Sequence, residues 1–426
     1  MHDLLVAGGT LPNGEIADIA VKGGKIVAVG RGIAVEARET IDASGLLVSP
    51  PFVDPHFHMD ATLSYGIPRI NGSGTLLEGI ALWGELKKIL THEAVAERAL
   101  EYCDWAVSMG LLAIRSHVDV CDERLLAVDA LVEVRERVAG YIDLQLVAFP
   151  QDGLYRSAGA RDNLIRALDK GVDVVGGIPH FERTMEDGRR SVTDLCEIAE
   201  QRGLLVDIHC DETDDPMSRH IEQLAFETNR LGLNGRVAGS HLTSMHSMDN
   251  YYVSKLLPLI AEAEVSAISN PLINIVIQGR HDTYPKRRGL TRVPEMLKHG
   301  IRVGWGQDCC LDPWYSLGTA DMLDVAFMGL HVAQMTSPAD MRKCFEMVTA
   351  DNAAILHLEN YGLNPGCQAS FVVLDANDPA EAVRLRAERI LVVAKGNVVF
   401  RNPKRAPELS LPDRPGTIDR RRKYSP

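Results

Sequence analysis

Between residues 52 and 58 the chain reads FVDPHFH, a short apolar run that ends in two histidines one residue apart. In an extended segment, residues i and i+2 point to the same side, so His56 and His58 face the same way. Two imidazoles on one face make half of a metal site. A lone HxH pair also arises by chance, so its meaning depends on what the rest of the chain places beside it.

Seven more short apolar runs follow, each succeeded by polar residues and then by a stretch with helical periodicity, as at 94–109 and 125–138. Eight strand–helix units in sequence predict an α/β fold, a closed (β/α)8 TIM barrel. The rival, an open doubly wound sheet, usually has fewer strands and a glycine-rich first turn, whereas PHFH stands there in this chain. The expected strands cover 52–54, 111–114, 144–149, 172–178, 204–208, 237–239, 265–268 and 301–305.

The two ends of the chain have a different pattern, in which short apolar runs alternate with glycine and asparagine turns. Such runs are typical of small antiparallel strands. The sequence KGNVVF at 395–400 echoes KGGKIV at 22–27, so we expect both termini to build one small β-sandwich domain. The predicted boundaries are 1–49 and 366–426 for this domain and 50–365 for the barrel.

Composition narrows the class of protein. The 426 residues carry a net charge of -13, and this acidic balance argues against nucleic acid or an anionic membrane surface as the main partner. Eight scattered cysteines without a CxxC motif, and no signal-peptide pattern at the start, predict a cytoplasmic protein. No apolar stretch approaches the roughly 20 residues of a membrane-spanning helix. The basic run Arg420–Lys423 is expected to be a solvated tail on the surface.

Two histidines and an acid stand directly after later apolar runs, at the same relative place as the HxH pair: His209, His241 and Asp308. In a barrel, the carboxyl ends of the strands form the rim that carries the active site. A single buried histidine is usually a satisfied core residue. Four strands that end in ligand-type residues instead favour a shared metal site.

Glu212 follows His209 by three residues, from where a carboxylate reaches past a metal toward substrate. That is the place of a group that carries protons; the alternative is a surface glutamate in an acidic loop. Together these residues suit hydrolysis at an amidine-like carbon. A divalent metal lowers the pKa of bound water to roughly 7, and histidines with one carboxylate hold it and leave an open position.

The segment PFVDPHFHMD at 51–60 resembles the opening motif of the amidohydrolase superfamily. Other segments are similar to the bacterial cytosine deaminases. The resemblance spans nearly the whole chain, and its most specific part is the run QGRHDTYPKRRG. The segments are FPQDG at 149–153, IPHFE at 178–182, HCDE at 209–212, SHLTSMH at 240–246, QGRHDTYPKRRG at 278–289 and DPWYSLGTA at 312–320.

The resemblance implies a free nucleobase as the partner, a homo-oligomer, and one divalent metal, zinc or iron. It implies that Glu212 protonates the pyrimidine N3, that His241 and Asp308 handle the proton of the hydrolytic water, and that Gln151 hydrogen-bonds the carbonyl and ring N–H. Two-metal relatives often carry a bridging lysine on the fourth strand, and residues 172–179 contain none. The implied metal ligands are His56, His58, His209 and Asp308, and the implied pocket wall is Leu76, Phe149 and Trp314.

One departure from the family pattern bears on the substrate. The residue after the metal-type aspartate is typically a second acid, and this chain has Cys309, which should lie beside C5 of the base. A thiol is smaller and less polar than a carboxylate, so it leaves room for a methyl group without a desolvation penalty. We therefore expect 5-methylcytosine to be preferred, with cytosine weaker; neutral drift at this position is the alternative. Isoguanine shares the same amidine–carbonyl edge.

Three other classes of protein fit the sequence less well. Zinc deaminases of nucleosides and nucleic acids carry H-x-E and P-C-x-x-C elements, and neither is present. A ring-opening hydrolase of the dihydropyrimidinase or dihydroorotase kind is disfavoured because the fourth strand has no lysine. A non-catalytic scaffold on the same fold would be expected to lose ligands. The roles of His180, His246 and Asp119 stay open.

Overall fold

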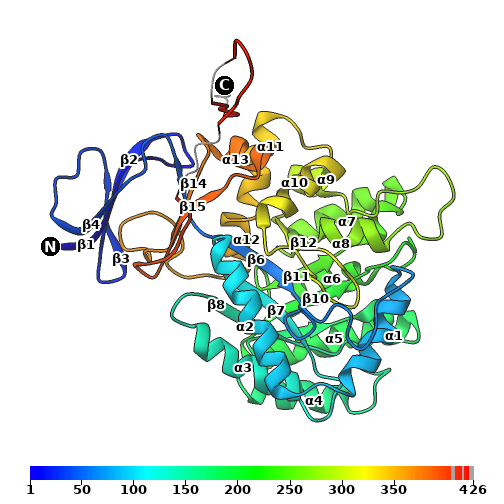
Figure 1. The fold of residues 1–426 in the computed structure, drawn as a ribbon. Coiled ribbons are helices and arrows are strands. Elements are labelled where there is room, and N and C mark those ends of the chain that lie inside the picture. The colour runs from blue at the N-terminus through cyan, green and yellow to red at the C-terminus, as the bar shows by residue number, and fades with distance from the viewer. Residues whose placement is uncertain (404–407, 415–416, 422–426) are drawn as a thin grey trace.

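The computed structural model of the chain describes residues 1–403, 408–414 and 417–421. It shows an α/β barrel with a smaller β domain at its side, and strands from both ends of the chain meet in the β domain (Figure 1). Of the basic run, Arg422 and Lys423 lie outside the described residues. Arg420 is exposed, whereas Arg421 is partly buried and donates to the carbonyl of Gly45 at 3.0 Å, which ties this end of the chain to the β domain.

The barrel sheet has eight parallel strands whose spatial order follows their order in the chain. A parallel bridge between Phe57 and Asp308 brings the last strand back to the first. Each of the eight predicted apolar runs overlaps one strand, so the predicted (β/α)8 fold is confirmed. The strands are β6 (Phe52–Phe57), β7 (Leu111–Asp119), β8 (Asp143–Phe149), β9 (Val174–Gly177), β10 (Leu205–Cys210), β11 (Val237–His241), β12 (Ser266–Ser269) and β13 (Val303–Trp305).

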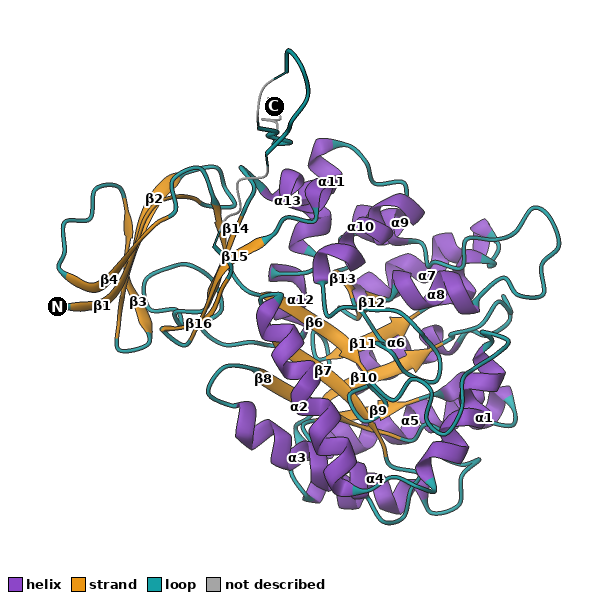
Figure 2. Cartoon of the chain, in the orientation of Figure 1, coloured by secondary structure: helices purple, strands orange, loops and turns teal. Residues whose placement is uncertain are grey.

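Helices cover the outside of the barrel strands (Figure 2). Local sequence sets the ends of these helices. At the start of α5 the side chain of Thr184 accepts the N–H of Asp187, and Gly203 ends that helix with a φ of 69°. The helices are α1 (Leu76–Lys87), α2 (His92–Ser108), α3 (Leu126–Val138), α4 (Ala160–Asp169), α5 (Met185–Arg202), α6 (His220–Leu231), α7 (Asn250–Glu262), α8 (Pro271–Ile277), α9 (Val293–Lys298), α10 (Met322–Val332), α11 (Pro338–Glu346), α12 (Ala350–Ile355) and α13 (Pro379–Leu385), with short 3-10 helices η1 (Pro179–Phe181) and η2 (Thr243–His246).

The β domain is one sheet in the order β16-β15-β14-β5-β1-β2-β3, with β4 paired to β1. The two ends of the chain meet where β5 pairs antiparallel with β14, so that Val48 lies opposite Val373. Strands from both ends bury a shared core that includes Val6, Ile19 and Phe371. The prediction that both termini build one β domain is confirmed. Its strands are β1 (His2–Thr10), β2 (Ile16–Lys22), β3 (Lys25–Gly30), β4 (Ala37–Asp42), β5 (Leu47–Ser49), β14 (Phe371–Leu374), β15 (Arg389–Ala394) and β16 (Asn397–Arg401).

The β domain joins the barrel beside the amino end of β7. Gly110 lies immediately before β7, and a Cβ there would stand 2.5 Å from the Val372 side chain of β14. Its φ of 72° also favours glycine. Arg389 of β15 pairs with the buried Asp321 and donates to the carbonyl of Met109 at 2.9 Å. The β domain therefore packs away from the carboxyl ends of the strands, where barrel sites form.

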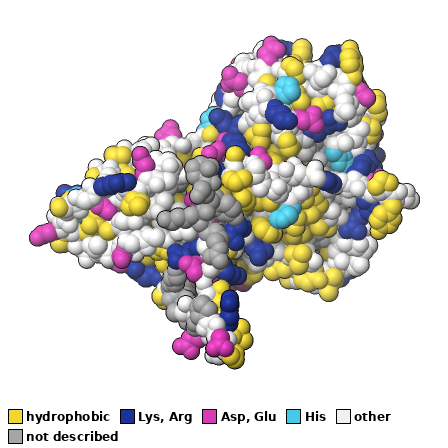
Figure 3. All heavy atoms as spheres, turned by 90° about the horizontal axis from the view of Figure 1, so that it is seen from above, with side chains coloured by type: hydrophobic (Ala, Val, Ile, Leu, Met, Phe, Trp, Pro, Cys, Tyr) yellow, Lys and Arg dark blue, Asp and Glu magenta, His cyan; other side chains and the backbone are white. Residues whose placement is uncertain are grey.

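Among the described residues, no helix combines the length and the apolar character needed to cross a membrane. On the face seen in Figure 3, basic and acidic side chains are interspersed with apolar ones. This face therefore carries charge of both signs rather than one continuous patch.

One buried amide bridges the first and the last barrel strand. Asn352 of α12 is fully buried, and its Nδ2 donates to the carbonyl of Val53 in β6 at 2.7 Å and to the carbonyl of Trp305 in β13 at 2.9 Å. Gly304 makes room for it, because a Cβ at Gly304 would stand 2.1 Å from Asn352 Oδ1. The side chain thus reinforces the closure of the barrel.

We predict that Asn352→Ala destabilises the fold, because both buried carbonyls lose a donor. Each unsatisfied buried polar group costs about 1–3 kcal/mol, so the free energy of unfolding should fall by roughly 2–5 kcal/mol, measured by urea unfolding. Asn234→Ala is the control, since the Asn234 amide contacts Asn229 and the carbonyl of Glu262 at the surface. Equal losses for the two variants would contradict the assigned role.

Candidate active site

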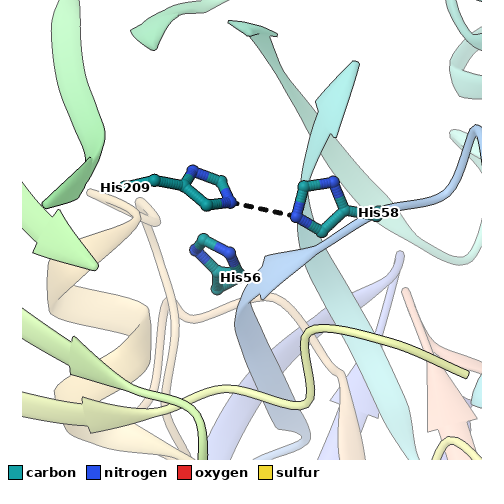
Figure 4. Close-up of side chains that lie close together, drawn as sticks. All are labelled: His56, His58 and His209. Carbon is teal, nitrogen blue, oxygen red and sulfur yellow. Dashed lines mark hydrogen bonds between the residues drawn. The ribbon is translucent and has the colours of Figure 1, made fainter. Parts of the chain in front are cut away.

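Four side chains converge at the carboxyl end of the barrel. His56 lies in β6 and His58 directly follows it, His209 lies in β10, and Asp308 stands three residues after β13. Figure 4 shows the three histidine rings close together. The Nε2 atoms of His58 and His209 are 3.1 Å apart, and Asp308 Oδ1 lies 3.3 Å from His58 Nε2 and 3.5 Å from His56 Nε2. The structure thus brings the four sequence-predicted ligands to one point.

The chemistry of this cluster fits a divalent cation. All four residues are at most 7% exposed, and His56 Nε2 is buried without a hydrogen-bond partner. The ligand atoms of His56, His58 and His209 lie within 4.8 Å of one another, close enough to share one ion. Three imidazole nitrogens and one carboxylate oxygen are a donor set that catalytic zinc and related cations take. The cluster is therefore suited to a single metal.

Burial and the contacts among these groups favour the metal-binding forms of His56, His209 and Asp308. Burial lowers the pKa of His56 and His209 well below the ordinary histidine value, and neighbouring imidazoles add to the effect. Burial alone would raise the pKa of Asp308, but the neighbouring imidazoles of His56, His58 and His241 outweigh it and hold that pKa well below its usual value. Neutral imidazoles and an ionised carboxylate are the metal-binding species.

The contacts behind His56 fix its orientation. Its Nδ1 lies 2.9 Å from Ser240 Oγ, and that hydroxyl donates to Asp207 Oδ1 at 2.7 Å. Asp207 in turn pairs with Arg115 at 3.0 Å. Because Ser240 gives its proton to Asp207, it accepts from Nδ1–H of His56. The Nε2 lone pair of His56 is then free to face the cluster.

Sequence reasoning missed His117, which lies in β7 and is fully buried beside the cluster. Its ring centroid is 4.1 Å from that of His56 and 4.5 Å from that of His209. With His56 and Asp207 it forms a second group of closely spaced ligand-type atoms. The signal was present in the alternating sequence RSHVD at 115–119, but the predicted strand ended at 114, before the polar residues that continue β7 toward the rim.

Glu212 and His241 lie beside the histidine cluster. His241 Nδ1 is 3.2 Å from Glu212 Oε1 and 3.9 Å from Asp308 Oδ2, and Asn274 Nδ2 stands 2.9 Å from the same nitrogen. Burial raises the pKa of Glu212 well above its ordinary value, and the charge of Asp308 raises it further. Burial lowers the pKa of His241 to about 4. The site therefore pairs a proton-bearing carboxyl with a neutral imidazole.

A cavity of about 230 Å³ opens beside these groups. The cavity is lined by four residues that the sequence analysis assigned to the substrate: Gln151, Cys309, Trp314 and Leu76. His180, for which the sequence suggested no role, also lines it. The remaining wall is mostly apolar and includes Leu77, Ile80, Ile178, Phe181, Ile273 and Ile277. A largely apolar wall with a few polar groups suits a small, flat ligand held by specific hydrogen bonds.

Three further residues from the sequence analysis lie behind or outside this wall. Phe149 stacks on the ring of His209, with centroids 4.1 Å apart and planes at 13°, so it supports that imidazole from behind. His246 Nε2 lies 3.1 Å from Asp214 Oδ1. Asp119 accepts the indole N–H of Trp83 at 2.8 Å. None of these contacts places the three residues against the cavity.

Comparison with known proteins agrees with the fold and shows the family. The model of the amidohydrolase family matches residues 39–400. A solved structure of 5-methylcytosine deaminase from Klebsiella pneumoniae, liganded with 5-fluorocytosine, is 40% identical with a TM-score of 0.92, over 96% of this chain and 100% of that one. N-isopropylammelide isopropylaminohydrolase from Burkholderia multivorans is 26% identical with a TM-score of 0.83, over 94% and 99%. Pterin deaminase of Rhizobium rhizogenes is 27% identical, over 96% and 92%.

The chain belongs to the amidohydrolase family, as the resemblance in its sequence predicted. It is a metal-dependent hydrolase that acts on carbon–nitrogen bonds. Among the structures it is similar to, the deaminase of 5-methylcytosine shares the fold over the full length of that chain. The alternative of a non-catalytic scaffold is thereby set aside.

We predict that the purified chain binds one divalent cation and that His58→Ala weakens this binding by at least about 100-fold, because even the hydrogen-bond partners of a ligand contribute about 10–100-fold. Elemental analysis after dialysis against a competing chelator measures the affinity. His246→Ala is the control, since His246 contacts Asp214 instead of the cluster. Unchanged metal retention in His58→Ala would refute the ligand set.

Proposed function

We propose that this enzyme removes the exocyclic amine of a free cytosine-type base by hydrolysis, with 5-methylcytosine preferred over cytosine and isoguanine as a further substrate. The observation that carries the proposal is the convergence of Glu212, His241 and Asp308 on one cavity that also presents Gln151 and Cys309. The similarity to the Klebsiella deaminase supports the choice of base.

A divalent cation held by His56, His58, His209 and Asp308 would lower the pKa of a water molecule to about 7 and so supply a nucleophile at neutral pH. Histidine and carboxylate ligands serve both zinc and iron, and we propose one of these two. Strand β9 carries no lysine, which accords with a single cation.

The protein groups would move the protons. Glu212, whose pKa is raised, would donate its proton to N3 of the ring as the nucleophile adds to C4. His241 and Asp308 would accept one proton of the water and return it to the leaving amine. The second proton, released as the C4 hydroxyl becomes the carbonyl, would restore Glu212. One water is consumed, and one ammonia leaves for each 4-oxo base formed. Gln151 would hold the carbonyl and the ring N–H on the opposite edge.

Cys309 would face C5 of the base. The residue is 3% exposed, and its Sγ lies 3.7 Å from Asp308 Oδ1. Burial, with the charges of Asp308 and Asp312, raises the pKa of the thiol well above its ordinary value, so the group is neutral. A neutral thiol leaves room for a methyl group and has no charge to desolvate.

We predict higher kcat/KM for 5-methylcytosine than for cytosine in an ammonia-release assay of the metal-loaded enzyme. Cys309→Asp should lower the ratio of the two kcat/KM values by at least about fourfold, the worth of one buried methyl group at about 0.8 kcal/mol. Cys309→Ser keeps the size and neutrality and should retain most of the preference. An unchanged ratio of the two kcat/KM values in Cys309→Asp would refute the role of the thiol. If the wild-type enzyme released no ammonia from any cytosine-type base, the proposed function would be refuted. Pterin would then be assayed.

We predict that Glu212→Gln lowers kcat by about 100- to 10,000-fold with little change in KM, because the amide keeps the shape of the side chain but carries no acidic proton. Ammonia release under saturating base gives kcat. The control is Glu222→Gln, since Glu222 accepts a hydrogen bond from the hydroxyl of Tyr252 at 2.7 Å and does not line the cavity. A kcat for Glu212→Gln within a few-fold of wild type would exclude the proton-transfer role.

A further inference from the structure

Gln151 stands in a tight turn that directly follows β8. The turn is closed by the N–H of Gly153, which donates to the carbonyl of Pro150 at 2.9 Å, and the N–H of Gln151 donates back to the carbonyl of Phe149 at 2.9 Å. Gly153 has a φ of 93°, and a Cβ there would lie 2.9 Å from Glu182 Oε2. The backbone that presents Gln151 to the cavity is therefore packed against a carboxylate from another element.

That carboxylate anchors the downstream side of the turn. Glu182 directly follows η1 and is 9% exposed. Its Oε1 accepts the N–H of Leu154 at 2.5 Å, its Oε2 accepts the N–H of Arg156 at 2.9 Å, and Tyr155 donates to both oxygens at 3.2 and 3.3 Å. Three successive backbone donors on one charged acceptor make a strong anchor, because bonds to an ionised group are about twice as strong as neutral ones.

A lysine holds the other side of the same turn. Lys87 ends α1, its side chain is 16% exposed, and its Nζ lies 2.6 Å from Asp152 Oδ2 and 2.8 Å from Asp119 Oδ2. Asp119 is itself fixed by the indole N–H of Trp83 at 2.8 Å. Burial would lower the pKa of Lys87, but the two carboxylates outweigh it and raise that pKa above its ordinary value.

Lys87 also connects the turn to another part of the cavity wall. The first turns of α1 carry Leu76, Leu77 and Ile80, which line the cavity, and Lys87 closes the same helix. Because Asp152 is the residue next to Gln151, this one ammonium group ties a helix of the apolar wall to the turn that presents the Gln151 amide. The geometry is that of a clamp whose two sides are Lys87 and Glu182.

We propose that Lys87 and Glu182 are positioning residues that hold the Gln151 amide against the carbonyl and N–H edge of the base. The proposal rests on the proposed function, in which Gln151 reads that edge. An amide recognises a carbonyl only within a narrow range of distance and angle, and a displacement of about 1 Å in a site costs up to about 100-fold. Neither residue touches the substrate; both act through the backbone of the turn.

A double-mutant cycle tests this clamp on the metal-loaded full chain. Lys87→Met, Gln151→Ala and the double variant are compared with wild type by kcat and KM for the preferred base. Lys87→Met should raise KM about tenfold with a smaller change in kcat. In the Gln151→Ala background the same substitution should have little further effect, because the group through which it acts is gone. Glu182→Gln should also raise KM in the wild-type background and have little further effect in the Gln151→Ala background. This variant tests the proposal if Lys87→Met does not fold.

The control is Lys343→Met. Lys343 also pairs with two carboxylates, those of Asp351 at 2.6 Å and Glu346 at 3.2 Å, but it lies on α11 and does not line the cavity. The KM of the Lys343→Met variant should equal that of the wild-type enzyme. Additive losses in the cycle, or equal KM changes in both lysine variants, would overturn the clamp while wild-type turnover leaves the proposed function standing. A wild type that releases no ammonia from any cytosine-type base would overturn both.

Discussion

Two backbone hydrogen bonds at Asp308 join the first barrel strand to the segment after the last, and the site depends on them. The N–H of Asp308 donates to the carbonyl of His56 at 2.8 Å, and its carbonyl accepts the N–H of His58 at 3.0 Å. The contact that closes the barrel therefore also sets a carboxylate beside two imidazoles. Ligands that are about 250 residues apart in the chain are held on rigid elements, which is what a metal site requires.

The charge of Asp308 changes the pKa values of two neighbouring groups, Glu212 and His58. Its carboxylate raises the pKa of Glu212 in addition to the effect of burial, and it offsets the effect of burial on the pKa of His58.

Asp308 and His241 both have a positive φ, 72° and 71°, in a region that residues other than glycine rarely occupy. Such strain costs about 1–3 kcal/mol and persists only where the surrounding structure over-determines it. Here the barrel closure and the neighbouring strands provide that constraint.

The sequence predicted the fold and the residues at the strand ends because both depend on local patterns. An apolar run followed by a histidine or an acid marks the rim of a barrel, and His209 and Asp308 were found in this way. The sequence analysis did not assign a role to His117 or Asp207. Both are polar residues inside barrel strands, where apolar residues are expected. The contacts of Glu182 join segments that no periodicity relates, so only the folded chain reveals them.

The arrangement of charge around the cavity supports the role proposed for the thiol at position 309. Asp312 is buried, burial raises its pKa to about 7, and its Oδ1 accepts the N–H groups of Trp314 and Tyr315 at 2.9 Å each. It thereby fixes one wall of the cavity beside Asp308. A further carboxylate at 309 would add a like charge to this buried pair and would favour a polar group at C5. The neutral thiol of Cys309 removes both effects, so a methyl group in the proposed binding mode meets an uncharged neighbour.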